Sequence, residues 1–102
     1  MGYIRVDVTD ERIDLAKIVS ELGENENGAQ VLFSGVVRAT NDGKRVLAVS
    51  YDVFSPLAEA TMRQISREAH AQCGDPLKVV VIHRKGRLAV GEVSLVIGVS
   101  SP

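Results

Sequence analysis

The chain has 102 residues, of which 45% are hydrophobic and 25% are charged, and its 12 basic and 13 acidic residues nearly cancel. This composition is typical of one globular domain, and the charge balance argues against a protein that coats nucleic acid. No apolar stretch approaches the ~20 residues that span a bilayer, and a single cysteine excludes an intrachain disulfide. We therefore expect one cytoplasmic domain over residues 1–102, with no metal site and no cofactor.

The chain opens with a predicted strand and helix. From Tyr3 to Val8, polar and apolar residues alternate, which is typical of a half-buried strand. Thr9 or Asp10 can cap a following helix, and Gly23 is suited to end it. The apolar positions of this helix recur every three residues, at Ile13, Ala16, Val19 and Leu22. This pattern predicts that one face of the helix is buried.

A hairpin is predicted next. Gly28 to Val37 is a long run with apolar residues on both faces, which indicates a strand. Asn41-Asp42-Gly43 favours a tight turn, because Asn and Gly tolerate a positive φ. Leu47 to Val53 alternates between apolar and polar residues and predicts the returning strand. We therefore expect these two strands to pair across the turn.

Ser55 and Pro56 favour the start of a second helix, with the serine as N-cap and the proline in the first turn. Gly74 and Pro76 are suited to end it. Its apolar stripe comprises Leu57, Thr61, Ile65 and Ala69, with Ala58, Met62 and Cys73 beside them. We expect this stripe to pack on the sheet, and Cys73 to be buried there rather than to act as a nucleophile.

Two more strands, Leu77–His83 and Glu92–Ser100, complete the predicted order β-α-β-β-α-β-β. Strands that outnumber helices, together with a central hairpin, favour an α+β fold with two helices on a mostly antiparallel sheet. The last strand is strongly apolar, so it needs neighbouring strands or a covering element.

The residues with most chemical interest are basic. His83, Arg84 and Lys85 follow an apolar strand directly, and Arg38 ends another apolar strand in the same way. Each group can simply be a solvated strand end, or the two strand ends can converge on an anion such as a phosphate, which arginine binds with two parallel hydrogen bonds. Because side chains alternate along a strand, His83 and Lys85 share one face and Arg84 the other, which favours a site shared between chains.

Three segments resemble a known family, the large catalytic subunit of molybdopterin synthase. "GAQVLFSGVVR" is similar to the family's G-A-x-x-x-F-x-G-x-V-R strand, and "VVVIHRKGRLAVGEVSLVIGVSS" is similar to its H-R-x-G-x-L stretch. Between them, "LAVSYDVFSPLAEATMRQISREA" resembles the family's strand-to-helix segment. The resemblance covers nearly the whole chain, and it implies the family's fold, the α/β hammerhead.

The resemblance implies a function in molybdenum cofactor biosynthesis. Such a subunit transfers sulfur from the thiocarboxylate of a ubiquitin-like small subunit to cyclic pyranopterin monophosphate, which forms molybdopterin. The large subunits form a homodimer and, with two small subunits, a heterotetramer. The resemblance also implies that Arg38, His83 and Arg84 bind the substrate. Lys85 departs from the family, which usually has an apolar residue there, and is considered a candidate accessory residue because it is basic and nearby.

The family's C-terminal helix and its catalytic lysines would begin where this sequence ends, at Pro102. No lysine of the chain matches those positions, so the catalytic residue is not identified. Two alternatives therefore stay open: a non-catalytic homologue that dimerises or binds the small subunit, and an unrelated phosphate-binding domain. Without the helix, we expect the last strand to be uncovered and to favour self-association or a covering partner.

Overall fold

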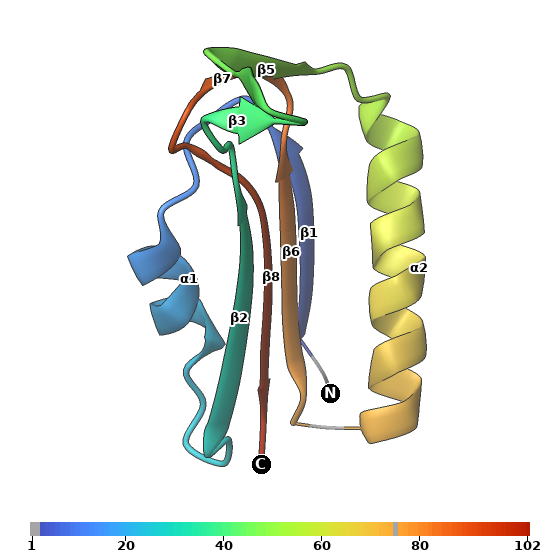
Figure 1. The fold of residues 1–102 in the computed structure, drawn as a ribbon. Helices are drawn as coiled ribbons and strands as arrows, with labels where there is room; N and C mark the ends of the chain where they lie inside the picture. Colours follow the sequence, from blue (N-terminus) through green and yellow to red (C-terminus); the bar gives the residue numbers. More distant parts are fainter. Residues whose placement is uncertain (1–2, 75) are drawn as a thin grey trace.

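The computed structural model describes residues 3–74 and 76–102, and a four-stranded sheet forms its centre (Figure 1). The strands lie in the order β1-β6-β8-β2. Their bounds are β1 Tyr3–Thr9, β6 Lys78–Arg84, β8 Val93–Ser101 and β2 Ala29–Val36. β1 pairs in parallel with β6, whereas the β6–β8 and β8–β2 pairs are antiparallel.

Two helices cover opposite faces of this sheet (Figure 1). α1 (Leu15–Leu22) packs on β8 and β6, and α2 (Ser55–Cys73) packs mainly on β1 and reaches β6. The buried cluster on the α1 side comprises Ile18, Leu22, Val80, Ile82 and Val96. The cluster on the α2 side comprises Val6, Leu77, Val79 and Val81. Alternation along β6 therefore supplies buried valines to both faces.

Two small sheets stand at one end of the main sheet (Figure 1). β3 (Thr40–Asn41) pairs with β4 (Lys44–Arg45), and β5 (Ala48–Tyr51) pairs with β7 (Gly86–Ala89), both in antiparallel fashion. Two helices on a mostly antiparallel sheet confirm the predicted α+β fold.

The predicted pairing of two long strands across residues 41–43 is wrong. The turn forms, with positive φ values of 51° at Asp42 and 73° at Gly43, but it joins only β3 and β4. β2 pairs instead with β8, and β5 pairs with β7. β2 is apolar on both faces, and its apolar match, β8, lies far along the chain, where no local pattern reveals it.

The helix ends agree with the sequence better than the helix starts do. Gly23 and Gly74 are the C-caps of α1 and α2, as predicted. α1 is capped by Asp14 and not by the Thr9–Asp10 pair, because the Asp14 carboxylate accepts two backbone N–H groups of the first turn at 3.1 and 3.4 Å. The N-cap of α2 is Phe54, one residue before the predicted serine.

The buried faces of both helices are rotated from the predicted stripes. On α1, Ile18 is buried and Val19 is exposed, because positions three residues apart drift around a helix of 3.6 residues per turn. On α2, Leu57 and Ile65 are exposed, while Met62 packs against the core. Within the described ranges, neither helix is long and apolar enough to cross a membrane.

α2 leaves half of its side of the sheet uncovered. One row of paired residues crosses this side from β2 to β1, through Phe33, Ile97, Val81 and Val6. Their exposed fractions are 59%, 37%, 8% and 3% in that order. Because α2 packs on β1 and β6, the apolar side chains of β8 and β2 on this side remain in contact with solvent.

Candidate functional site

The carboxyl ends of β2 and β6 lie at the same end of the main sheet, with β8 between them. The backbone extends this arrangement past β2, where the Val37 N–H donates to the Glu92 carbonyl at 3.0 Å and the Gly91 N–H donates to the Val37 carbonyl at 2.8 Å. Arg38 is thereby held at the sheet end from which the basic residues of β6 also emerge.

Arg38 is exposed and is oriented by a short local contact. One of its terminal nitrogens, Nη2, donates to Asn41 Oδ1 at 2.9 Å. Both side chains line a hollow of about 240 Å³ whose other walls are four valines and Tyr51. An exposed guanidinium beside apolar walls is suited to a ligand with an anionic group and a flat, weakly polar body.

His83 lies next to this hollow through Tyr51. The two rings meet edge to face, with their centroids 5.3 Å apart. His83 Nδ1 lies 2.6 Å from the Arg84 carbonyl oxygen, which can only accept, so Nδ1 carries the proton and donates. In the neutral ring, Nε2 is then an acceptor. Tyr51 therefore joins Arg38 and His83 into one region of the surface.

Arg84 is turned away from this region. Only 7% of the residue is exposed, and it lies on the α1 side of the sheet, as the alternation along β6 predicts. Its Nη2 donates to the Asp10 carbonyl at 2.9 Å, its Nη1 lies 3.6 Å from Glu92 Oε2, and its buried Nε has no hydrogen-bond partner among the described residues. Within one chain, Arg84 does not share a hollow with Arg38.

Glu92 lies beside Arg84 and competes with any external anion for its guanidinium. Its carboxylate also accepts the Ala89 N–H at 3.1 Å and lies 3.2 Å from Arg12 Nη2. The Ala89 hydrogen bond, followed by the contact with Arg12, lowers the pKa of Glu92. The carboxylate is therefore held in its charged form beside Arg84.

Lys85 follows β6, and its backbone N–H donates to the Thr9 carbonyl at 2.9 Å. Its ammonium group makes no ion pair within the described residues. Cys73 is exposed, so its predicted burial is wrong, since α2 extends past the core before it ends. Residues 3–74 and 76–102 contain no group of three or more His, Cys, Asp and Glu side chains that could hold a metal ion.

Sequence reasoning missed Tyr51 and Glu92. Tyr51 is the last residue of an alternating strand, and its contact with His83 depends on the pairing of β5 with β7, which the sequence pattern does not contain. Glu92 follows Gly91, whose φ of 89° makes the turn before β8. The signal that could have identified Glu92 is an acidic residue that follows a glycine turn and lies close in sequence to the basic cluster.

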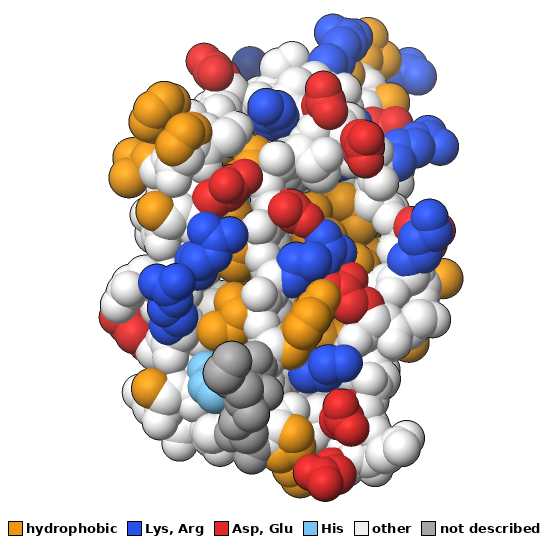
Figure 2. Space-filling view, turned by 180° about the vertical axis from the view of Figure 1, so that it is seen from behind, with side chains coloured by type: hydrophobic (Ala, Val, Ile, Leu, Met, Phe, Trp, Pro, Cys, Tyr) orange, Lys and Arg blue, Asp and Glu red, His pale blue; other side chains and the backbone are white. Residues whose placement is uncertain are grey.

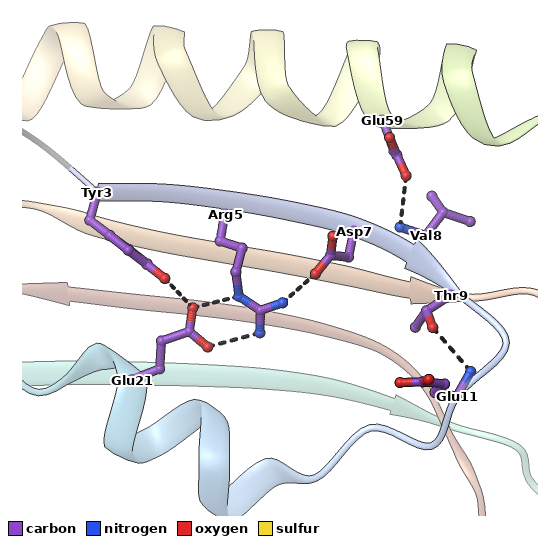
Figure 3. A network of polar contacts seen from close by, with 8 residues as sticks. All are labelled: Tyr3, Arg5, Asp7, Val8, Thr9, Glu11, Glu21 and Glu59. Carbon is purple, nitrogen blue, oxygen red and sulfur yellow. Dashed lines mark hydrogen bonds and ion pairs between the residues drawn. The ribbon is translucent and has the colours of Figure 1, made fainter.

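A second polar cluster covers the β1 edge of the sheet. Seen from behind, this side carries interleaved basic and acidic side chains (Figure 2). Arg5 donates to both carboxylate oxygens of Glu21 on α1 and also contacts Asp7, while the Tyr3 hydroxyl donates to Glu21 at 2.6 Å (Figure 3). The hydrogen bond from Arg5 lowers the pKa of Glu21, and the same bond raises the pKa of Arg5. These charges compensate one another and hold α1 to β1.

Comparison with known proteins identifies the family of the chain, which the residues alone leave open. A family model described as "MoaE protein" matches residues 8–102. The chain belongs to the MoaE protein family. The two solved structures described below share the fold of this chain.

Three proteins illustrate what the chain is similar to. A molybdopterin synthase catalytic subunit from Bacillus subtilis is 33% identical over 98 residues, which are 96% of this chain and 62% of that protein. A solved molybdopterin synthase from Staphylococcus aureus superposes with a TM-score of 0.84 at 27% identity, covering 93% of this chain and 69% of that one. A chain of the Helicobacter pylori complex of subunits 1 and 2 of molybdopterin-converting factor shares the fold, with a TM-score of 0.66 at 18% identity. This match covers 96% of the present chain and 64% of the Helicobacter pylori chain. The chain thus spans about three fifths of the Bacillus protein.

Proposed function

We propose that this protein is the large subunit of a molybdopterin synthase. It transfers sulfur from the thiocarboxylate of a ubiquitin-like small subunit to cyclic pyranopterin monophosphate and so forms molybdopterin. The observation that carries the proposal is the family match across residues 8–102. It is supported by the 33% identical Bacillus subtilis protein, which is named a molybdopterin synthase catalytic subunit. The protein acts in the cytoplasm as one domain, and it assembles as a homodimer with a small subunit on each copy.

The region around Tyr51 is the proposed substrate site. Arg38 is exposed and binds the phosphate, and His83 presents Nε2 to the same ligand, as an acceptor when neutral and as a donor when protonated. The valine walls of the hollow exclude water from one side of the bound ring system. Each of these residues binds or orients the substrate, and none is assigned the attack on the thiocarboxylate.

In this proposal, the Arg84 that contacts the substrate belongs to the second large subunit. Within one chain it lies on the opposite side of the sheet from His83 and contacts Glu92. A substrate bound between two copies can meet Arg38 and His83 of one and Arg84 and Lys85 of the other. Release of Arg84 from Glu92 then frees its guanidinium for the anion.

The test is substrate binding followed by turnover. Arg38→Ala and His83→Ala should each weaken binding of cyclic pyranopterin monophosphate about ten- to hundredfold in calorimetry, since each removes a hydrogen bond to a charged group. Arg67→Ala, which removes an exposed arginine of α2, is the matched control and should bind like the wild type. Equal weakening in all three variants, or a wild-type protein that does not bind, contradicts the proposal.

A second candidate function is a non-catalytic homologue that keeps only the anion site and its protein contacts. The observation in its favour is that the residues of the candidate site, Arg38 and His83, are suited to bind an anion, and none of them is assigned a step in sulfur transfer. Mixing the protein with thiocarboxylated small subunit and substrate separates the two candidates. Molybdopterin formation supports the synthase, and substrate binding with no product supports the non-catalytic homologue.

A further inference from the structure

Two dipeptides of the chain have a sequence that favours spontaneous rearrangement of the backbone. They are Asn27-Gly28, in the loop before β2, and Asp42-Gly43, in the turn between β3 and β4. The backbone nitrogen after an Asn or Asp can attack the side-chain carbonyl carbon, and a glycine at that place offers no side chain to hinder the attack. By sequence alone Asn27 is the more reactive of the two, since an amide loses ammonia more readily than a carboxylate loses water.

The structure protects Asn27 from this reaction. Its side-chain nitrogen, Nδ2, donates to the Pro76 carbonyl at 2.8 Å and to Ser100 Oγ at 3.0 Å. Its backbone N–H donates to the Glu24 carbonyl at 3.0 Å. Ser100 is fully buried, so the contact with it ties the Asn27 side chain to the interior of the molecule. The side-chain carbon cannot turn towards the Gly28 nitrogen until both side-chain hydrogen bonds break.

Asp42 has none of these restraints. It is exposed, and its carboxylate makes no hydrogen bond or ion pair with another residue of the described ranges. Its φ of 51° lies in the left-handed region, which is unfavourable for a residue other than glycine. A Cβ atom added at Gly43 would meet nothing within 4 Å, so the space beside the attacking residue is open.

The hairpin that holds this turn is small, and it stands at the end of the main sheet (Figure 1). β3 and β4 have two residues each, all of them exposed, and one further backbone hydrogen bond, from the Val46 N–H to the Ala39 carbonyl, closes the hairpin. Such a peripheral element opens at a free energy far below that of global unfolding. The Asp42 backbone can therefore rotate into the geometry that the attack needs while the rest of the fold stays intact.

We infer that Asp42 is a modification site, at which the aspartate isomerises to isoaspartate as the protein ages. The Gly43 nitrogen forms a bond to the side-chain carbonyl carbon of Asp42, and the hydroxyl of the carboxyl group leaves with the amide proton as water. The product is a cyclic succinimide. Water then opens the ring at either carbonyl, and opening at the backbone carbonyl leaves an isoaspartate, in which the chain runs through the side-chain carbon. Water is the only co-reactant.

The isoaspartate changes the surroundings of Arg38. It adds a methylene group to the backbone of the turn, so the pairing of Asn41 with Lys44 loses its register. Asn41 then no longer holds its Oδ1 2.9 Å from Arg38 Nη2. This consequence rests on the proposed function, in which Arg38 binds the phosphate of the substrate, whereas the isomerisation itself does not. We therefore expect the isomerised chain to bind the substrate more weakly.

The first test compares two Asn-Gly pairs inside one molecule. Asp42→Asn gives the turn the same dipeptide as residues 27–28 and preserves the turn, because asparagine tolerates a positive φ. The folded variant is incubated at neutral pH, and deamidation at each position is followed by mass spectrometry of its peptides. The same measurement in guanidinium chloride gives the intrinsic rate of each pair, by which the rate in the folded chain is divided.

After this correction, position 42 should react at least about tenfold faster than Asn27, because two side-chain hydrogen bonds hold Asn27. Equal corrected rates, or a faster reaction at Asn27, would overturn the assignment of the reactive site to the turn.

The second test uses the wild-type chain, aged in buffer and compared with a fresh sample. Isoaspartate should appear in the peptide that carries Asp42, as an altered retention at unchanged mass, and affinity for cyclic pyranopterin monophosphate should fall in proportion to it. Asp42→Gly removes the carboxyl group and suits the positive φ, so its aged and fresh samples should bind equally. An aged wild type without isoaspartate at residue 42 would overturn the modification site. Isoaspartate with full affinity would overturn its effect on Arg38, whereas a fresh wild type that does not bind would contradict only the proposed function.

Discussion

The two outer strands of the sheet are built from similar apolar residues and meet opposite surroundings. Val6 of β1 is 3% exposed beneath α2, whereas Val31 of β2, on the same side of the sheet, is 67% exposed. Hydrophobic character along the chain therefore does not decide which residues form the core. The position of α2 decides it, because one helix is too narrow to cover four strands that lie about 4.8 Å apart.

The difference extends to the polar contacts. On the β1 side, Arg5 and Glu21 tie the strand to α1, and Glu59 ties it to α2. Among the described residues, β2 makes its regular backbone hydrogen bonds with β8 only, and the Ser94 hydroxyl of β8 also donates to the Gly35 carbonyl at 3.3 Å. The β1 side of the sheet is thus tied to both helices by side-chain contacts, whereas the β2 side is held mainly by its backbone pairing with β8.

The largest expected effect is the difference in stability between alanine variants of Val6 and Val31. Val6→Ala should lower the free energy of unfolding by about 2 kcal/mol, because it removes two buried methyl groups and leaves a cavity under α2. Val31→Ala makes the same change in an edge strand, so both variants lose the same strand propensity, but it should cost less than about 0.5 kcal/mol. Urea unfolding at low protein concentration measures both. Equal losses would mean that α2 does not protect the β1 side.

A smaller effect is expected from the ion pair on the β1 side. Glu21→Gln removes the charge that Arg5 contacts, and it should cost about 1 kcal/mol or less, because the Arg5 side chain is 35% exposed and solvent screens the pair. Glu26→Gln, in the exposed loop before β2, is the control and should be neutral. Thermal unfolding of the two variants gives the comparison, and a neutral Glu21→Gln would show that the network contributes no stability.

The smallest effect concerns pH. The hydrogen bond from Arg5 lowers the pKa of Glu21 in the folded chain from its usual value of 4.5, so the unfolded chain binds this proton at a higher pH. The stabilisation is complete above the unfolded pKa and is lost as the pH falls through the folded one. Between about pH 5 and pH 3, wild-type stability should therefore fall more steeply than that of Glu21→Gln. If the stabilities of the wild type and Glu21→Gln fell in parallel over this pH range, the lowered pKa of Glu21 would not contribute to stability.

Local features of the fold could be predicted because they depend on neighbouring residues. Gly23 and Gly74 end their helices, and Asp42 and Gly43 make a turn. Gly74, Asp42 and Gly43 have positive φ values, which glycine and aspartate tolerate better than most residues do, whereas Gly23 ends α1 in an extended conformation. The partners of β2 and β5 could not be predicted, because β8 and β7 lie far along the chain. The rotation of α2 depends on which strands it covers, and its own apolar positions do not contain that information.

The candidate site was predicted in part for the same reason. Alternation along β6 predicts that His83 and Arg84 lie on opposite sides of the sheet, and their positions agree. Tyr51 and Glu92, which hold these two residues, come from segments that reach the site only through tertiary pairing. Whether Arg38, His83 and Arg84 bind the pterin remains a prediction for the binding assay.

The order of strands in the sheet has a consequence for folding during synthesis. Within residues 3–74 and 76–102, β1 pairs only with β6, and β2 pairs only with β8. β8 is the last of these strands in chain order and stands between β6 and β2. Neither of the first two long strands finds its partner until most of the chain has left the ribosome. Contacts so distant in sequence slow folding, so the nascent chain carries the uncharged AQVLFSGV segment unpaired through most of its synthesis. Chaperone binding to that segment is therefore expected to matter most before β8 emerges.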